Sequence, residues 1–195
     1  MPAAFPDFLT HYSRGEPFRS VTSAPQEQWG AIVAGFSDAN VWGRDRFADP
    51  QYLSRRLVVE ERLRAEFVDG GGEPQVEHPF YCVVGGLGRW ERQRTTGMRA
   101  YILPLTDLPS ASISFTFGDS LLTYDEDNRS QAAALGRYLH PLSGRLYRLE
   151  GVRELASRIP AGGSDPPRDL HKHLEAQVWV TPNVASLRVI ELPVC

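Results

Sequence analysis

Apolar and polar residues alternate in the segment "HKHLEAQVWV", residues 171–180, which is the pattern of a β-strand. Successive side chains of a strand point to opposite faces of its sheet. One face of this strand would be apolar, with Leu174, Ala176, Val178 and Val180. The other face would carry Glu175, Gln177 and Trp179. This polar stripe is either a solvated surface or the floor of an active site.

The same periodicities predict the remaining elements. Helical spacing of apolar residues indicates helices at residues 23–36 and 49–70, and shorter ones at 127–139 and 150–159. Runs of β-branched and aromatic residues bounded by Gly or Pro indicate strands at residues 8–15, 78–86, 98–105, 111–117, 144–149 and 186–192. Because helices come early and strands later, we expect an α+β fold. It would be a single domain over residues 1–195, with a bent or split, mainly antiparallel sheet and a few helices mainly on one side.

Both long helices carry signals for their ends. In the first, Ser23 is a candidate N-cap, with Gln26 at the capping-box spacing. The second would begin after Asp49 and end at Gly70. Four arginines make this second helix basic: Arg55, Arg56, Arg62 and Arg64. Because charged residues on helices usually face solvent, we expect these side chains on its outer face, together with an i,i+4 pair of Glu60 and Arg64.

The composition is that of an ordinary globular protein. Of the 195 residues, 42% are hydrophobic and 23% are charged, with a formal net charge of −3. The negative balance argues against tight, non-specific binding to nucleic acid, but leaves room for a local basic groove. No apolar run reaches the roughly 20 residues of a membrane span, and the first residues lack the features of a secretory signal. With two cysteines only, we expect a cytoplasmic protein without membrane contact.

The signals for metal and nucleophilic chemistry are weak. His171 and His173 would face the same way on a strand, but a zinc site needs three or four ligands. We therefore expect no metal, and keep a metal-dependent hydrolase built on these two histidines as an alternative. The chain has no GxSxG motif, and Cys82 lies in an apolar run without the positive surroundings that make a reactive thiolate.

The polar stripe offers the clearest catalytic chemistry. A carboxylate on a strand can stabilise a developing cation, such as the oxocarbenium ion formed when a glycosidic bond breaks. Glu175 suits this role, with Gln177 as its hydrogen-bonding neighbour. The large aromatic side chain of Trp179 on the same face favours a partly covered cleft over simple solvation.

Several segments of the sequence, taken in their order along the chain, resemble the segments of a known protein family. "THYSR" provides a first strand in which a His is followed by an aromatic residue, and a capped helix follows at Ser23. "HPFYCVVGG" is an apolar strand, and "SFTFGDS" is a strand of the "FTxGxS" kind. "LEAQVWVTPNVASLRVIELPV" is an acidic strand followed by a closing apolar one. This order resembles that of ADP-ribosyltransferase-like proteins, especially bacterial toxin families of the DarT type.

The resemblance implies an ADP-ribosyltransferase-like fold and NAD as substrate. It also implies that Glu175 and Gln177 are the catalytic pair. Matching "VWV" to the apolar triplet of the family places Gln177 where the catalytic Glu is expected, with Glu175 two residues earlier on the same face. Either Glu175 takes the catalytic role, or the enzyme is altered or inactive.

The resemblance further implies a set of cofactor-binding residues. His11 would hold NAD, and Tyr12 or Tyr124 would stack on the nicotinamide. Arg55 or Arg56 would meet the pyrophosphate through two parallel hydrogen bonds.

Three functions therefore compete. The first is an enzyme that cleaves the nicotinamide–ribose bond of NAD and transfers ADP-ribose to a macromolecule, or hydrolyses NAD. The second is a non-catalytic binding or regulatory domain of the same fold. The third is the metal-dependent hydrolase. For the first, the acceptor is left open between a protein and a nucleic acid.

Overall fold

The computed structural model describes residues 5–35, 51–86, 97–134, 141–158 and 174–192, and within them seven strands form one antiparallel sheet. The strands are β1 (Phe8–Ser13), β2 (Phe80–Val84), β3 (Arg99–Pro104), β4 (Ile113–Phe117), β5 (Leu146–Tyr147), β6 (Leu174–Val178) and β7 (Arg188–Glu191). Their order across the sheet is β5-β4-β6-β2-β1-β3-β7. In the central trio β6-β2-β1, a single strand, β2, thus separates strands from opposite ends of the chain.

The helices come from all five described ranges of the chain. The α-helices are α1 (Trp29–Gly35), α3 (Tyr52–Asp69), α5 (Ser120–Tyr124), α6 (Glu126–Ala134) and α7 (Leu149–Arg158). Short 3-10 helices are η1 (Val21–Ser23), η2 (Gln26–Gln28), η3 (Leu105–Asp107), η4 (Ser110–Ser112) and η6 (Val184–Ser186). The α+β class expected from the sequence is confirmed. None of the helices in the described ranges is both long and apolar enough to span a membrane.

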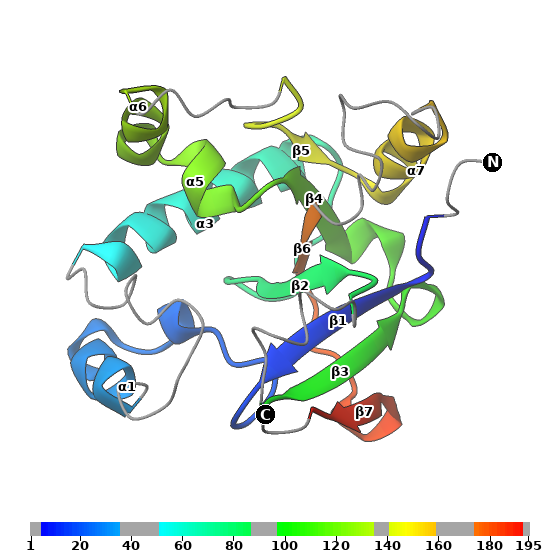
Figure 1. Ribbon diagram of the computed structural model, residues 1–195, viewed down its shortest axis with the longest axis horizontal. Helices are drawn as coiled ribbons and strands as arrows, with labels where there is room; N and C mark the ends of the chain where they lie inside the picture. Colours follow the sequence, from blue (N-terminus) through cyan, green and yellow to red (C-terminus); the bar gives the residue numbers. More distant parts are fainter. Residues whose placement is uncertain (1–4, 36–50, 87–96, 135–140, 159–173, 193–195) are drawn as a thin grey trace.

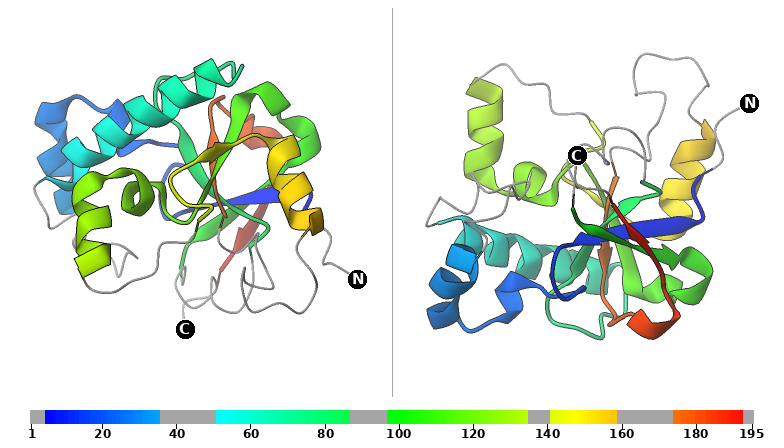
Figure 2. Two further views of the ribbon diagram at one scale, coloured as in Figure 1. Left: turned by 90° about the horizontal axis from the view of Figure 1, so that it is seen from above. Right: turned by 60° about the horizontal axis from the view of Figure 1, so that its bottom comes forward.

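The sheet is strongly bent. In Figure 1, β4 and β6 run steeply across the direction of β1 and β3, and β2 joins the two parts. Helices α3, α5 and α6 lie on one side of β4 and β6, and α7 lies on the other (Figures 1 and 2). The helices therefore cover both sides of this part of the sheet, whereas we expected them mainly on one side.

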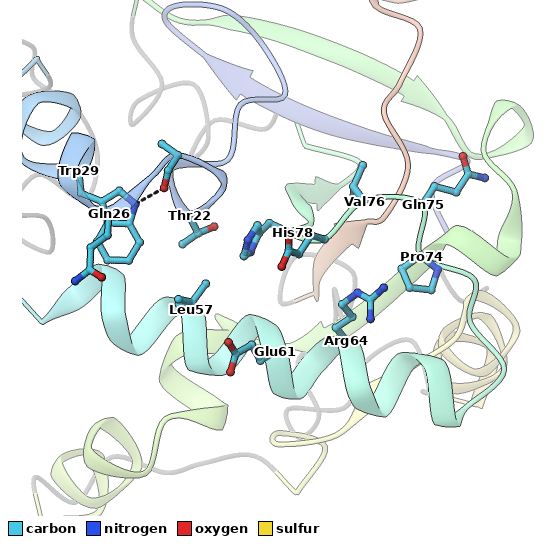
Figure 3. Close-up of a pocket in the computed structure, with 12 residues that line it drawn as sticks. Thr22, Gln26, Trp29, Leu57, Glu61, Arg64, Pro74, Gln75, Val76 and His78 are labelled. Atoms are coloured by element: carbon cyan, nitrogen blue, oxygen red, sulfur yellow. Dashed lines mark hydrogen bonds between the residues drawn. The ribbon is translucent and has the colours of Figure 1, made fainter.

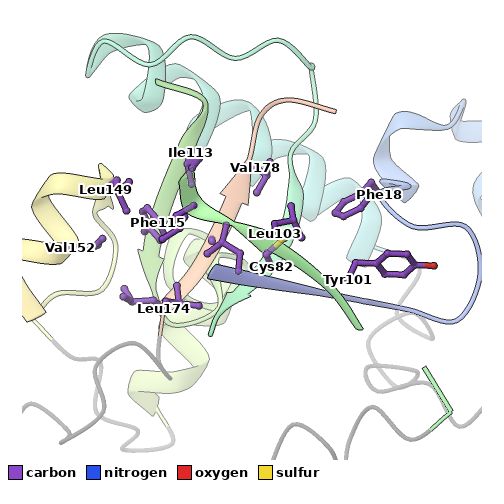
Figure 4. Packing of buried hydrophobic residues seen from close by; sticks show 14 of the residues in the cluster. Phe18, Cys82, Tyr101, Leu103, Ile113, Phe115, Leu149, Val152, Leu174 and Val178 are labelled. Carbon is purple, nitrogen blue, oxygen red and sulfur yellow. The ribbon is translucent and has the colours of Figure 1, made fainter. Parts of the chain in front are cut away.

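The apolar faces of the strands build the main core. On β6 these are the side chains of Leu174, Ala176 and Val178, which are buried as the alternating pattern predicts. They pack with the apolar residues of β4 and with Leu149 and Val152 of α7 (Figure 4). Cys82 of β2 is buried in the same cluster, and this burial raises the pKa of its thiol.

The opposite face of β4 and β6 lies under α3. Val59, Leu63 and Phe67 of α3 are buried there against Trp179, whose ring stacks on Phe67 with centroids 5.5 Å apart. The polar stripe of β6 is therefore covered by a helix, and is not a solvated surface. This arrangement confirms that the face carrying Trp179 is covered, and it places Trp179 in a core cluster.

One of the two long-helix predictions needs correction. Residues 23–36 do not form one helix capped by Ser23, because η1 and η2 precede an α-helix that begins only at Trp29. Pro25 stands between the two 3-10 helices and has no N–H to continue a hydrogen-bonded helix. The second helix ends as predicted, with Gly70 as C-cap, while Asp49 lies outside the described residues.

Candidate functional site

The candidate site is a pocket of about 330 Å3 between the N-terminal half of α3 and the central strands. We call it the Glu175 pocket. Its polar and aromatic lining residues come from six segments and include His11, Tyr12, Thr22, Tyr52, Arg56, Glu60, Tyr81, Asp119 and Glu175. Four of the residues predicted from sequence therefore meet here, namely His11, Tyr12, Arg56 and Glu175. They meet because β1 and β6 are separated in the sheet only by β2.

Glu175 is held in the pocket by three groups. Its Oε1 accepts a hydrogen bond from the backbone N–H of Ser120 (3.2 Å) and another from the Gln177 amide (3.1 Å). Its Oε2 lies 4.0 Å from the Arg56 guanidinium. Burial is the main cause that raises the pKa of Glu175, with Arg56 opposing the rise and Asp119 adding to it. A carboxylate fixed in this way can stabilise a cation or accept a proton.

Asp119 and Ser120 reach the site through the turn that follows β4. Gly118 makes this turn with a φ of +81°, a conformation that favours glycine. Asp119 then caps α5 by accepting a hydrogen bond from the Leu121 N–H (3.0 Å), and its carboxylate lies 3.7 Å from Arg56. The five-residue helix α5 after this turn was not predicted from the sequence.

Arg56 is the central cation of the site, and it is buried, with 8% of its surface exposed. Its guanidinium lies 3.5 Å from Glu60 and contacts Asp119 and Glu175 as well. It also lies over the Tyr81 ring, 3.7 Å from the centroid. Burial alone would lower the pKa of Arg56, but the surrounding tyrosines and carboxylates raise it overall, so it stays charged. The predicted solvent-facing position is therefore wrong for Arg56.

Glu60 joins the site to its surroundings. It is 1% exposed and receives hydrogen bonds from Thr22 Oγ1 (2.6 Å) and Tyr81 Oη (3.0 Å). His78 Nδ1 lies 2.9 Å from Glu60 Oε2, the same oxygen that accepts the hydrogen bond from Thr22. The predicted exposed pair of Glu60 with Arg64 is therefore wrong, because Glu60 points inward and pairs with Arg56. A single buried carboxylate thus ties α3 to η1 and β2.

Gln177 lies behind Glu175 in a fully buried position, and it does not line the pocket. The indole N–H of Trp179 donates to Ser114 Oγ (2.8 Å), and the Ser114 hydroxyl donates to Gln177 Oε1 (3.0 Å). The Gln177 amide nitrogen is therefore turned toward Thr116 Oγ1 (3.0 Å) and Glu175. Because an indole N–H can only donate, the Ser114 hydroxyl is left to donate to Gln177 Oε1, and the Gln177 amide nitrogen then donates to Thr116 and Glu175. Gln177 is a positioning residue for Glu175, since it has no surface from which to contact a substrate.

His11 lines the pocket with both ring nitrogens already bonded. Its Nδ1 lies 2.9 Å from the Tyr81 carbonyl, and a carbonyl can only accept, so Nδ1 carries the proton. Its Nε2 accepts from the backbone N–H of Phe18 (3.2 Å), whose ring stacks on the imidazole at 4.5 Å. Burial lowers the pKa of His11, which keeps the ring neutral. In this arrangement the ring nitrogens have no free position for a ribose hydroxyl.

Two further predicted residues, Arg55 and Tyr124, lie outside the Glu175 pocket. Arg55 directly precedes Arg56 on α3, so it points in a different direction around the helix and does not line the pocket. Tyr124 packs in the cluster with Trp179, and its hydroxyl donates to Glu66 (3.0 Å), so it is not in position to stack on a ligand in the pocket. His171 and His173 lie outside the described residues. In the part of the chain that the structure does describe, no group of three or more His, Cys, Asp or Glu side chains could hold a metal ion.

A second, larger cavity of about 820 Å3 lies along the next face of α3 (Figure 3). We call it the Trp29 groove. Leu57, Glu61 and Arg64 of α3 form one wall, and residues 74–78 form the opposite wall. Trp29 closes one end, and its indole N–H donates to the Ala24 carbonyl (2.9 Å). Although it is larger, this groove holds none of the buried carboxylates, so we place the chemistry in the Glu175 pocket.

Sequence reasoning missed Tyr52, Glu60 and Tyr81 as parts of the site. Tyr81 was visible in principle, because β2 pairs with β6 and places Tyr81 opposite Gln177 on the polar face. Glu60 and Tyr52 had no such signal in the sequence. On a helix, a charged residue is normally expected on the surface and an aromatic residue in the core, unless tertiary contacts place it in a site. No protein-family model, curated protein or solved structure matches the chain. The site is therefore interpreted from its own geometry.

Proposed function

We propose that the Glu175 pocket binds the nicotinamide–ribose half of NAD, and that the protein cleaves the bond between nicotinamide and ribose there, as in ADP-ribosyltransferase-like proteins. The observation that carries this proposal is the Glu175 carboxylate, held by Ser120, Gln177 and Arg56 inside a pocket lined by aromatic side chains. The resemblance found in the sequence names a His on the first strand and an acidic residue on a late strand. Here His11 and Glu175 line one pocket.

The charge and shape of the pocket suit this ligand. Its lining contains three carboxylates (Glu60, Asp119 and Glu175) and two guanidinium groups (Arg19 and Arg56), so it is acidic overall. Its aromatic walls include Tyr12, Tyr52 and Phe80. A flat ring with a positive charge, such as the nicotinamide of NAD, is favoured in these surroundings. A volume of about 330 Å3 suits half of the dinucleotide, with the adenosine half outside.

The proposed reaction begins with cleavage of the C–N bond between ribose C1 and the nicotinamide nitrogen. The electron pair of this bond leaves with nicotinamide, which becomes neutral, and the ribose becomes an oxocarbenium cation. Glu175 stabilises this cation through space. Water or an acceptor then forms a new bond to C1, and its proton passes to Glu175, whose raised pKa suits a base.

Arg56 and His11 take positioning roles in this proposal. Arg56 is surrounded by Glu60, Asp119 and Glu175, so it orients these carboxylates and we do not assign it to the pyrophosphate. Through its two ring nitrogens, His11 links the backbone of Phe18 to the backbone of Tyr81 in β2. This link shapes one wall of the pocket.

The proposal is tested by nicotinamide release from NAD. We expect turnover by the intact protein, and a loss on the order of 100-fold or more in kcat/KM for Glu175→Gln, because the substitution removes the charge and keeps the shape. The matched control is Glu191→Gln, an exposed carboxylate on β7 whose side chain is 80% exposed. Turnover by Glu175→Gln at the rate of the intact protein would exclude the catalytic assignment.

A non-catalytic binding domain of the same fold is the second candidate. It is favoured by Gln177, an amide at the position where the resemblance places a catalytic Glu, buried in a satisfied network. This candidate predicts NAD binding without nicotinamide release, and no effect of Glu175→Gln beyond a change in affinity. The same assay, run beside a binding measurement, separates the two.

A further inference from the structure

The Trp29 groove lies directly beside the Glu175 pocket. Thr22 lines both cavities, and its hydroxyl donates to Glu60 of the pocket. From the groove side, His78 reaches the same Glu60 with its Nδ1 at 2.9 Å. The wall between the two cavities is therefore a single layer of side chains. A chain bound in the groove therefore lies one layer of side chains away from the Glu175 pocket.

The groove combines apolar and acidic surfaces. Trp29, Leu57 and Val76 provide apolar lining, and the Trp29 ring is fixed by its hydrogen bond to Ala24. The charged lining consists of Glu61 and Glu77 against Arg64. Both carboxylates belong to exposed residues, so they are solvated and able to meet a partner. The excess of negative charge, next to an acidic pocket, disfavours the phosphate backbone of a nucleic acid.

We propose that the Trp29 groove is the docking site for a protein acceptor, and that it takes an extended segment carrying basic and apolar side chains. A Lys or Arg side chain would pair with Glu61 and Glu77, and its stem or an apolar neighbour would lie on Trp29 and Leu57. This inference rests on the proposed function. It decides between the two acceptor classes that the sequence left open, in favour of protein.

The groove can be tested without NAD, by fluorescence anisotropy of a labelled eight-residue peptide of alternating Arg and Leu. Controls are the same peptide with Glu in place of Arg, and a labelled single-stranded DNA of 12 nucleotides. We expect the Arg–Leu peptide to bind the intact protein, and the other two probes to show no saturable binding. Saturable binding of the DNA with no binding of the peptide would overturn the proposal in favour of a nucleic-acid acceptor.

Variants with reversed charges test whether the peptide binds in the Trp29 groove. The double variant Glu61→Lys, Glu77→Lys should weaken binding of the Arg–Leu peptide about tenfold, because two exposed charge pairs become repulsive. Asp69→Lys is the matched control, since Asp69 is an exposed acid at the far end of the same helix. We expect it to bind the peptide like the intact protein. Equal weakening by both variants would mean general attraction to an acidic protein, and would overturn the groove assignment.

The same variants separate a failure of this inference from a failure of the proposed function. Nicotinamide release into water should be unchanged in the double variant, because its substitutions lie outside the Glu175 pocket. Transfer of ADP-ribose to the peptide or to a larger basic protein should fall together with binding. Peptide binding without nicotinamide release would support the groove as a docking site and reject the proposed enzyme activity. Nicotinamide release without groove-dependent peptide binding would support the enzyme activity and reject the docking site.

Discussion

Replacing Arg56 by Met tests whether the buried charge cluster holds the site together. Met replaces the aliphatic stem of Arg and has no charge, so it removes the guanidinium and leaves an apolar chain in its place. In the intact protein this guanidinium lies 3.5, 3.7 and 4.0 Å from Glu60, Asp119 and Glu175, respectively. Glu60 is the most buried of the three, with 1% of its surface exposed. After the substitution, these carboxylates would face one another without their shared cation.

The expected cost is large because the partners that remain are buried. Removing one member of a buried ion pair typically costs about 3–5 kcal/mol, since the other charge is left without compensation. The contact over the Tyr81 ring at 3.7 Å is lost as well. A typical domain has only about 5–15 kcal/mol of stability, so Arg56→Met should remove a large part of it.

The assay is urea unfolding at pH 7, followed by circular dichroism, with Arg62→Met as the matched control. Arg62 lies on the same helix and pairs with Glu66 at 3.3 Å, but its side chain is 47% exposed. An exposed pair of this kind is worth at most about 1 kcal/mol. We expect Arg56→Met to lower the free energy of unfolding several times more than Arg62→Met does. Equal effects of the two substitutions would refute the account of a buried cluster organised by Arg56.

The pH dependence provides a second readout for the same variant. Burial raises the pKa of Glu175 above its usual value of 4.5, while Arg56 opposes this rise. A raised carboxyl pKa means that the folded state holds its proton more tightly than the unfolded state, so stability falls as pH rises through the range above 4.5. Without Arg56 the pKa should rise further. The stability gap between Arg56→Met and the intact protein should therefore widen from pH 5 to pH 7 and narrow on acidification.

Three further predictions concern single groups. Burial lowers the pKa of His11 below 6.5, so the ring should be neutral at pH 7 with its proton on Nδ1, as NMR of the imidazole nitrogens would show; a ring protonated at pH 7 would contradict the assigned hydrogen bonds. Trp179→Phe removes the donor to Ser114 and should lower the free energy of unfolding by about 1–3 kcal/mol, measured by urea unfolding, whereas no change would mean that the chain of bonds is not formed. Burial raises the pKa of the Cys82 thiol, so a thiol reagent should modify Cys82 only after unfolding, and rapid labelling of the folded protein would contradict its burial.

The strands and the polar stripe could be predicted from sequence because both depend on local alternation. The period-two pattern placed Glu175 and Gln177 on one face, and pairing of β6 with β2 and β4 keeps them there. The same pattern indicated a covered face through Trp179, which is fully buried. Local order along the chain was sufficient for these features.

The charge cluster under α3 could not be predicted in this way. Arg56 and Glu60 are four residues apart on a helix, a spacing that is typical of solvent-facing pairs. Their burial depends on β2 and the Asp119 turn, which come from distant parts of the chain. Similarly, His11 has no free ring nitrogen only because the chain returns at Phe18. These features arise from tertiary contacts for which the sequence has no local signal.

The central claim, that the Glu175 pocket is a cleft for NAD, is tested most directly by titrating NAD into the intact protein in a calorimeter. The account predicts saturable binding with a Kd between about 1 μM and 1 mM, as is common for cofactor-sized ligands of a small pocket. Binding should weaken in Glu175→Ala and stay unchanged in Glu191→Ala, the exposed carboxylate on β7. Absence of saturable binding by the intact protein, or equal binding by both variants, would contradict the account.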